Sequence, residues 1–205
     1  FQLVQKIAVA IVIPLSLFTA YLLTKNPINT VQYLEVTSKR GMVTKTVLPD
    51  STIVWLNSGS TLRYPSFFQS SERNVELNGE AYFDVARNEE QRFIINTGKD
   101  LSISVLGTEF NVEAYADDNS ITTTLVEGSV RLDYKDEAGL RKQSLLTPSQ
   151  KLVYETESGR AQQESVSVSQ YIAWKDGKIV FEDTNLKDAL HILGKHFNVD
   201  FVVKN

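Results

Sequence analysis

Residues 75–86 read VELNGEAYFDVA, and this stretch decides the fold class. Apolar and polar side chains alternate before and after the pair Asn78-Gly79. Alternation with a period of two is typical of strands that bury one face, and Asn-Gly favours a tight turn between strands. The stretch therefore predicts two short strands, 74–77 and 81–85, joined by a turn at this pair.

The same pattern continues outward on both sides, over residues 41–154. Short runs of β-branched and aromatic residues recur between turn-forming pairs such as Pro49-Asp50 and Glu127-Gly128. No part of this region shows helical periodicity. Short strands at such close spacing predict a mainly β domain, either a sandwich of two sheets or a solenoid of stacked strands.

The N-terminal segment has a different character. Residues 7–23 read IAVAIVIPLSLFTAYLL, without a charge, and as a helix they would extend about 26 Å, enough to cross a bilayer. A buried core helix would carry more polar residues on one face. A signal peptide would be cleaved after small residues, whereas bulky Phe18 and Tyr21 stand at the candidate positions. We therefore expect one transmembrane helix over residues 1–24, followed by a connector over 25–40.

The composition excludes several kinds of function. The 205 residues carry 21 basic and 25 acidic side chains, a formal net charge of −4. A nucleic-acid-binding surface needs an excess of positive charge, so we expect no nucleic-acid partner. The chain has no cysteine, which excludes disulfides, zinc–thiolate sites and cysteine nucleophiles. No cofactor is expected.

The C-terminal part passes from a polar stretch to patterned sequence. Residues 155–173 are polar and are interpreted as a linker. Beyond them, Lys178–Phe181 and Val199–Val203 have the composition of strands, and between them apolar residues recur with helical spacing over 186–197. Residues 174–205 therefore predict a small β-α-β unit.

Five segments of the chain occur in a recognisable order, and together they resemble a known family. They are LPDSTIVWLNSGSTLRYP (48–65), VELNGEAYFDVA (75–86), VLGTEFNVEAY (105–115), TTLVEGSVRL (123–132) and LTPSQ (146–150). In this order they resemble the periplasmic domain of FecR-family anti-sigma factors. The closing stretch 174–203 resembles the start of the small module that follows this domain in many members, which is similar to the secretin and TonB short N-terminal fold.

The resemblance implies a topology and a function. It implies a cytoplasmic sigma-binding segment, one inner-membrane helix and a periplasmic domain in a Gram-negative cell. Because the chain begins at Phe1 rather than Met, we expect it to be a piece of a longer protein that lacks the cytoplasmic segment. The implied role is an anti-sigma factor, not an enzyme, that relays the state of a TonB-dependent outer-membrane transporter to an extracytoplasmic-function sigma factor. The alternative is a membrane-anchored β-rich module that binds carbohydrate or cell wall, and a third possibility is a hydrolase.

Partner binding is expected in the C-terminal unit. The resemblance implies that this unit binds the signalling domain of the transporter, and strand addition or sheet packing is the expected mode. The candidate edge residues are Lys178, Ile179, Val180, Phe181, Val199, Phe201 and Val203.

Two serines depart from the family pattern. Ser51 and Ser149 stand where the family commonly has glycine, in the turns after Asp50 and Pro148. Serine disfavours a positive φ, so we expect the types of these two turns to differ from those of the family.

The pair Gly107-Thr108 is the candidate site for chemistry. The resemblance implies that some members cut themselves at a Gly-Thr bond by an N→O acyl shift. The threonine hydroxyl is adjacent to the preceding carbonyl, and glycine leaves that carbonyl uncrowded, but the shift also needs backbone strain and an oxyanion donor. The alternative is a bulge glycine followed by a strand threonine.

Other polar and aromatic residues are interpreted as structural. His191 and His196 are five apart, which does not place two metal ligands on one helical face, so no metal site is expected. Asp117-Asp118-Asn119 is interpreted as a turn rather than a calcium loop. The acidic residues that a glycosidase pair would require fit exposed strand positions, and they are Glu76, Glu80, Asp84, Glu109, Glu113 and Glu127. The aromatic residues expected in the core are Trp55, Tyr64, Phe67, Phe68, Tyr82 and Phe83, and Trp174 is expected to pack the C-terminal unit onto the β domain.

Overall fold

The computed structural model describes residues 2–24, 31–69, 71–182, 184–197, 199 and 201. The chain divides into two compact units, residues 1–32 and residues 33–205. Each unit is described by itself below.

The first unit contains one helix, α1 (Gln2–Thr24), with Pro14 inside it. The helix forms where the apolar run predicted it. In length and composition its stretch Gln5–Leu22 is sufficient to cross a membrane. The hydroxyl groups of Ser16 and Thr19 donate hydrogen bonds to carbonyl groups of the same helix, which satisfies both groups in an apolar surrounding.

The second unit is built on thirteen strands within the described residues, which confirms the mainly β prediction. The strands are β1 (Tyr33–Thr37), β2 (Thr44–Val47), β3 (Ile53–Leu56), β4 (Thr61–Pro65), β5 (Glu72–Asp84), β6 (Arg92–Asn96), β7 (Leu101–Val105), β8 (Glu109–Ala114), β9 (Ser120–Glu127), β10 (Val130–Lys135), β11 (Arg141–Leu146), β12 (Gln150–Glu155) and β13 (Ala161–Ser165).

Strand β5 is the centre of the sheet. Its first half pairs with β4 and, in parallel, with β6, and its second half pairs with β3 and β8. The predicted turn at Asn78-Gly79 is wrong, because the strand runs through both residues. Gly79 has a φ of 112°, and a Cβ there would lie 2.6 Å from the Cα of Ser60. The glycine therefore serves a close approach between neighbouring strands rather than a chain reversal.

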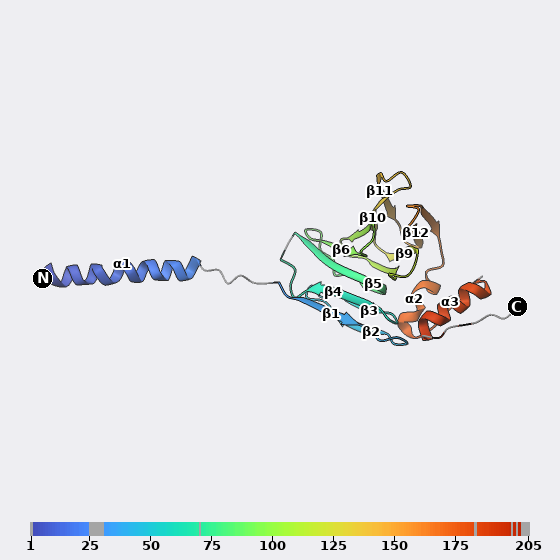
Figure 1. The fold of residues 1–205 in the computed structure, drawn as a ribbon, viewed down its shortest axis with the longest axis horizontal. Coiled ribbons are helices and arrows are strands. Elements are labelled where there is room, and N and C mark those ends of the chain that lie inside the picture. Colours follow the sequence, from blue (N-terminus) through green and yellow to red (C-terminus); the bar gives the residue numbers. More distant parts are fainter. Residues whose placement is uncertain are drawn as a thin grey trace. The chain divides into compact units, whose positions relative to one another are not determined.

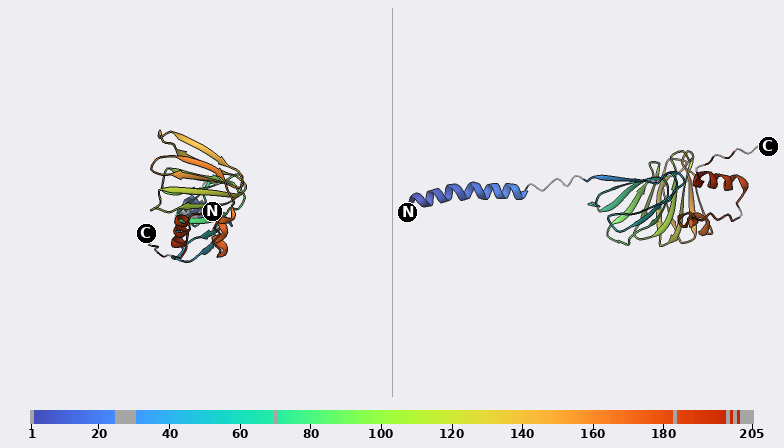
Figure 2. Two further views of the ribbon diagram at one scale, coloured as in Figure 1. Left: turned by 90° about the vertical axis from the view of Figure 1, so that its right-hand side faces the viewer. Right: turned by 90° about the horizontal axis from the view of Figure 1, so that it is seen from below.

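The strands form a curled, half-barrel sheet (Figures 1 and 2). Its continuous path runs β11-β10-β7-β6-β5-β8-β9-β12-β13, and β1, β2, β3 and β4 join it beside β5. Two arms thus leave the two ends of β5. Inward-facing side chains of both arms belong to one apolar cluster, so the curl closes on a single core.

Aromatic side chains fill the middle of that core. Phe83 of β5 stacks on Phe110 of β8 with ring centroids 5.3 Å apart and contacts Phe93 of β6 at 6.0 Å. All three side chains are fully buried, and burial of such a side chain stabilises the fold by about 1.5–3 kcal/mol. The aromatic core expected from the sequence is confirmed for Tyr64 and Phe83, whereas Tyr82 is buried outside the core cluster and Trp55, Phe67 and Phe68 are only partly buried.

Three helical segments follow the sheet. They are α2 (Ser169–Ile172), the 3-10 helix η1 (Ala173–Asp176) and α3 (Leu186–Phe197). Trp174 of η1 is buried, with 7% of its surface exposed. The stretch interpreted as a linker, residues 155–173, contains strand β13 as well as α2.

The predicted C-terminal β-α-β unit is not formed in the described residues. Its helix is present as α3, but Lys178–Phe181 is not a strand, and Val199 and Phe201 also lie outside any strand. Residues 198, 200 and 202–205, which include the rest of the predicted second strand, lie outside the described residues. A run of apolar residues becomes a strand only where another strand pairs with its backbone, and no described strand lies beside Lys178–Phe181.

Candidate functional site

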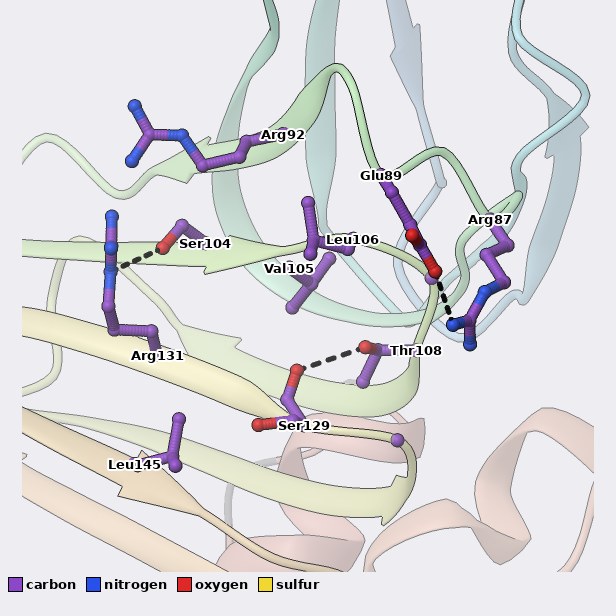
Figure 3. Close-up of a pocket in the computed structure, with 12 residues that line it drawn as sticks. Arg87, Glu89, Arg92, Ser104, Val105, Leu106, Thr108, Ser129, Arg131 and Leu145 are labelled. Atoms are coloured by element: carbon purple, nitrogen blue, oxygen red, sulfur yellow. Dashed lines mark hydrogen bonds and ion pairs between the residues drawn. The ribbon is translucent and has the colours of Figure 1, made fainter.

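The candidate cleavage pair lies in a pocket of the β domain. Gly107 and Thr108 occupy the bend between β7 and β8, opposite the turn Gly128-Ser129 between β9 and β10 (Figure 3). The pocket encloses about 440 Å³. Its lining residues are Arg87, Glu89, Arg92, Ser104, Val105, Leu106, Gly107, Thr108, Gly128, Ser129, Arg131 and Leu145.

The hydroxyl of Thr108 has one fixed orientation. Its Oγ1 donates a hydrogen bond to the carbonyl oxygen of Ser129 at 3.0 Å, and its own carbonyl accepts one from the amide of Val85 at 3.1 Å. Only 5% of the residue is exposed. Gly128 also keeps this corner tight, because a Cβ there would lie 2.9 Å from the Thr108 Oγ1. The side chain therefore cannot rotate without rearranging the facing turn.

Gly107 is required by a close approach of two chain segments. A Cβ at this position would lie 2.6 Å from the Cα of Arg87, a backbone atom that cannot move away cheaply. Its φ is not in the positive region, so the glycine does not serve a left-handed conformation. The close approach of Arg87 therefore supports the alternative interpretation, in which Gly107 has a structural role.

A buried arginine holds the backbone segments next to the pocket. Arg73 of β5 is fully buried, and its Nη1 lies 2.7 Å from Oδ2 of Asp50. The same guanidinium donates hydrogen bonds to the carbonyl oxygens of Ala86, Gln91 and Leu106. Residues 86–91 contain Arg87, which packs against Gly107, and Leu106 directly precedes Gly107. Arg73 therefore fixes the backbone segments that line the pocket.

Sequence reasoning missed Arg73, although a signal was present. Arg73, Val75 and Leu77 are spaced by two along β5, and all three are buried. The strand period therefore assigned Arg73 to the core face. A charge on a core face is buried only when it is paired and hydrogen-bonded, and this rule points to a carboxylate partner.

The rim of the pocket is basic. Arg87, Arg92 and Arg131 line it, and each forms an ion pair at the surface, with Glu89, Glu72 and Asp133 respectively. Figure 3 shows Arg131 against Ser104 and Arg87 against Glu89. The apolar side chains that line the pocket are those of Val105, Leu106 and Leu145.

The geometry orients the Thr108 hydroxyl but supplies little further catalysis. In the described part of the chain, neither a carboxylate nor an imidazole hydrogen bonds to the Thr108 Oγ1, and no donor is directed at the Gly107 carbonyl. An oxyanion donor typically accelerates acyl transfer by about 10²–10³. The bond contains no cis peptide, and neither residue has a positive φ. An acyl shift in this conformation would therefore be slow.

The candidate partner-binding residues lie apart from this pocket, at the C-terminal side of η1. Lys178 donates its amide to the Ala173 carbonyl at 3.1 Å, Phe181 is 45% exposed, and Ile179 and Val180 are partly exposed. Val199 donates its amide to the Gly194 carbonyl at 3.1 Å. Phe201 is 47% exposed, and Val203 lies outside the described residues.

Three of the acidic residues considered for catalysis, Glu76, Glu80 and Glu109, have structural partners in the described residues. Glu76 pairs with Arg63 at 3.0 Å, and Glu80 accepts hydrogen bonds from the amides of Asn57 and Asn111. Glu109 accepts a hydrogen bond from Tyr82. Burial and this carboxylate raise the pKa of the Tyr82 hydroxyl far above its ordinary value.

Asp118 and His196, which were considered as metal ligands, make other contacts in the described residues. No group of three or more potential ligands was found among them. The turn around Asp118 is closed by its amide, which donates to the Tyr115 carbonyl at 3.1 Å. The ring of His196 contacts Phe197 edge-on at 4.8 Å, and nothing is described of the His191 side chain.

The two serine turns differ from the expectation. Ser51 has a φ of 71° and Ser149 a φ of 65°. Both serines therefore adopt the left-handed conformation that glycine would adopt, and the expected change of turn type is wrong. The amide of Ser51 donates to the Leu48 carbonyl at 3.0 Å, and that of Ser149 donates to the Leu125 carbonyl at 3.1 Å. These hydrogen bonds to the buried residues Leu48 and Leu125 stabilise the turns against the steric cost.

The β domain is similar to a known family and to solved structures. Residues 35–131 match the family described as FecR protein. Two crystal structures of a candidate anti-sigma factor from Parabacteroides distasonis ATCC 8503 are similar to the chain, both with a TM-score of 0.73. One is 30% identical and covers 82% of this chain and 76% of that chain, and the other is 31% identical and covers 80% and 75%. The chain therefore belongs to the FecR family. No protein with a curated description matches it.

Proposed function

We propose that this chain is the membrane-anchoring and periplasmic part of an anti-sigma factor. The carrying observation is the match to a candidate anti-sigma factor, at 30% identity over 82% of this chain. In this proposal α1 crosses the inner membrane once, which its length and apolar composition support. The sigma factor would bind a cytoplasmic segment that precedes Phe1, and residues 33–205 would sense the signal in the periplasm.

The proposed signal comes from a TonB-dependent outer-membrane transporter. Its signalling domain would dock on the C-terminal residues of this chain, among which several apolar side chains are exposed. These are Phe181, Leu186, Ile192, Phe197, Val199 and Phe201. Burial of exposed apolar side chains is a typical driving force for such an interface.

Co-purification tests this proposal. The chain, in detergent, is mixed with the signalling domain of the transporter encoded beside it. We expect a stoichiometric complex that Phe181→Asp weakens at least tenfold, since a charge would enter an apolar interface. Leu140→Asp is the matched control, because Leu140 is 60% exposed at the β10–β11 turn, and it should bind as wild type. Absence of a complex between two folded proteins would contradict the proposed partner.

We also infer that Gly107-Thr108 is the bond at which this member would cut itself. In the balanced step, the Thr108 Oγ1 attacks the Gly107 carbonyl carbon, the C–N bond breaks, and the hydroxyl proton is transferred to the Thr108 nitrogen. The resulting ester is hydrolysed by water, which leaves a Gly107 carboxylate and a free Thr108 amine and hydroxyl. The inference rests on the family resemblance of this Gly-Thr pair, and the lack of an oxyanion donor among the described residues predicts slow and incomplete cleavage.

Gel electrophoresis and mass spectrometry of the purified chain test the cleavage. We expect two fragments with a new amino terminus at Thr108, no fragments from Thr108→Ala, and fragments retained in Thr108→Ser. Hydroxylamine, which attacks esters, should accelerate cleavage. Thr122→Ala on β9 is the control and should be cut like wild type. An intact wild-type chain, or an uncut Thr108→Ser variant, would contradict the acyl shift without touching the anti-sigma proposal.

The carbohydrate-binding alternative finds less support. An aromatic platform for sugars needs several exposed rings side by side. Among the described aromatic candidates, Tyr64, Tyr82 and Phe83 are buried, and Phe68 packs edge-on against Phe93.

A further inference from the structure

One row of side chains crosses seven strands on the face of the sheet that points away from the core. Neighbours in the row are directly paired across adjacent strands, from β2 to β13. Directly paired residues lie on the same face. The row consists of Lys45, Trp55, Tyr82, Asn111, Thr124, Lys151 and Glu164.

The middle of this row is buried although it faces away from the core. Tyr82 is 3% exposed, Asn111 4% and Thr124 0%. Residues 169–176, which form α2 and η1, lie on this face. Figures 1 and 2 show both segments beside the sheet.

The segment is attached at both of its ends. At one end, the hydroxyl of Tyr171 accepts a hydrogen bond from the Lys151 Nζ at 2.8 Å. At the other end, the Lys175 Nζ lies 5.4 Å from the ring centroid of Tyr82 and 5.9 Å from that of Trp55, a cation–π arrangement. Trp174 stands between the two attachments in sequence and is buried. Contacts on both sides of the tryptophan in sequence therefore join the C-terminal region to the β domain.

Polar atoms of both the row and the segment are buried without a partner among the described residues. The Asn111 Oδ1, the Thr124 Oγ1 and the Trp174 Nε1 are buried without a hydrogen bond among the described residues. Each unsatisfied buried polar group opposes burial, and water would satisfy all three when the segment lifts away. The contact is therefore weaker than its apolar burial alone would make it.

The segment also links two parts of the molecule. On its outer side, the Ser169 Oγ donates to the Glu182 Oε1 at 3.2 Å, just ahead of α3. On its inner side, Tyr82 under Lys175 donates to Glu109, the residue that follows Thr108. A movement of the C-terminal region can thus reach the pocket through consecutive contacts.

We propose that residues 169–176 form a detachable latch, which docks on the Trp55–Lys151 row and opens while the sheet remains folded. The latch is an intramolecular ligand of the sheet, and opening it exposes the row to water. Its use in signalling, as the element that a bound transporter domain would displace, rests on the proposed function. The latch itself is independent of that proposal.

Denaturant titration of the full chain in detergent tests the latch. The chain has two tryptophans, Trp55 and Trp174, and both lie in the docking contact. Their fluorescence and its quenching by acrylamide therefore report on the latch, whereas far-ultraviolet circular dichroism reports on the sheet. We expect the tryptophans to become exposed at a lower urea concentration than the one that unfolds the sheet.

Matched variants make the test specific. Lys175→Ala and Tyr171→Phe should each lower the fluorescence midpoint and leave the circular dichroism midpoint unchanged. Lys178→Ala, an exposed lysine just beyond the latch, should change neither midpoint. Coincident transitions in the wild type, or variants that lower both midpoints equally, would overturn the latch and make residues 169–176 an integral part of the domain. Failure of transporter binding alone would leave these midpoints unaffected, so the two proposals fail separately.

Discussion

The Nη1 atom of Arg73 lies 2.7 Å from Oδ2 of Asp50, and the arginine side chain is completely buried. The Asp50 carboxylate also accepts hydrogen bonds from the amide and the hydroxyl of Thr52. The pair therefore joins the β2–β3 turn to the central strand β5. It also stands behind the backbone that carries Gly107, because Arg73 reaches the Leu106 carbonyl.

Replacement of Arg73 should be severely destabilising. Arg73→Met leaves the Asp50 carboxylate without its cation and removes the arginine's hydrogen bonds to three carbonyl groups, and loss of one partner of a buried pair costs about 3–5 kcal/mol. Arg63→Met is the matched control, because the Arg63–Glu76 pair is exposed and such pairs contribute about 0–1 kcal/mol. Urea denaturation of both variants measures the difference. Equal losses would show that Arg73 is not a structural centre.

The two left-handed serines predict stabilising substitutions. Ser51→Gly and Ser149→Gly should each raise the free energy of unfolding by up to about 1 kcal/mol, since glycine removes the steric cost of a positive φ. Ser102→Gly, in the middle of β7, should instead lower it by about 0.5–1 kcal/mol, since glycine weakens a strand. A loss of stability at all three positions would contradict the assigned conformations.

Alanine substitutions at Gly79 and Gly98 distinguish the cost of steric overlap from the cost of an unfavourable backbone conformation. Both have a positive φ, 112° and 72°, but a Cβ at Gly79 would clash with Ser60, whereas a Cβ at Gly98 would meet nothing within 4 Å. Gly98→Ala should therefore cost about 1 kcal/mol, from conformation alone. Gly79→Ala should cost a further 1–3 kcal/mol or so from overpacking. Thermal unfolding monitored by circular dichroism measures both, and equal effects would rule out the close approach at β5.

Alkaline pH should destabilise the fold through Tyr82. Burial, together with the hydrogen bond to Glu109, raises its pKa in the folded state. Its contribution to stability is therefore complete below the unfolded pKa of about 10 and decreases as the pH rises above it, by up to about 1.4 kcal/mol per pH unit. Tyr82→Phe should flatten the fall in unfolding free energy between pH 10 and about 11.5. An unchanged slope in that variant would contradict the assignment.

Much of the fold could be predicted from local patterns in the sequence. The alternation around Val75 and Phe83 predicted strands with a buried face, and the uncharged run at 7–23 predicted the N-terminal helix. Both properties depend only on near neighbours in the chain. The five segments indicated the family, and the comparisons confirm it.

Predictions were wrong or incomplete where the structure depends on contacts between residues far apart in the sequence. Asn78-Gly79 has the sequence of a turn, yet Ser60 and the strands beside β5 keep it extended. Lys178–Phe181 has the composition of a strand, yet no described strand pairs with it. The candidate pair Gly107-Thr108 was found from the sequence, but the approach of Arg87, the facing Ser129 carbonyl and the absent oxyanion donor were not.

The sequence by itself determined the mainly β domain, the apolar helix and the family, because strand alternation, apolar length and ordered motifs are properties of adjacent residues. Only the tertiary structure decided that Arg73 is paired with Asp50 and that residues 169–176 cover the row from Trp55 to Lys151. Those contacts join residues that are far apart in the chain. Their strength depends on burial and on hydrogen-bond geometry, which no local pattern encodes.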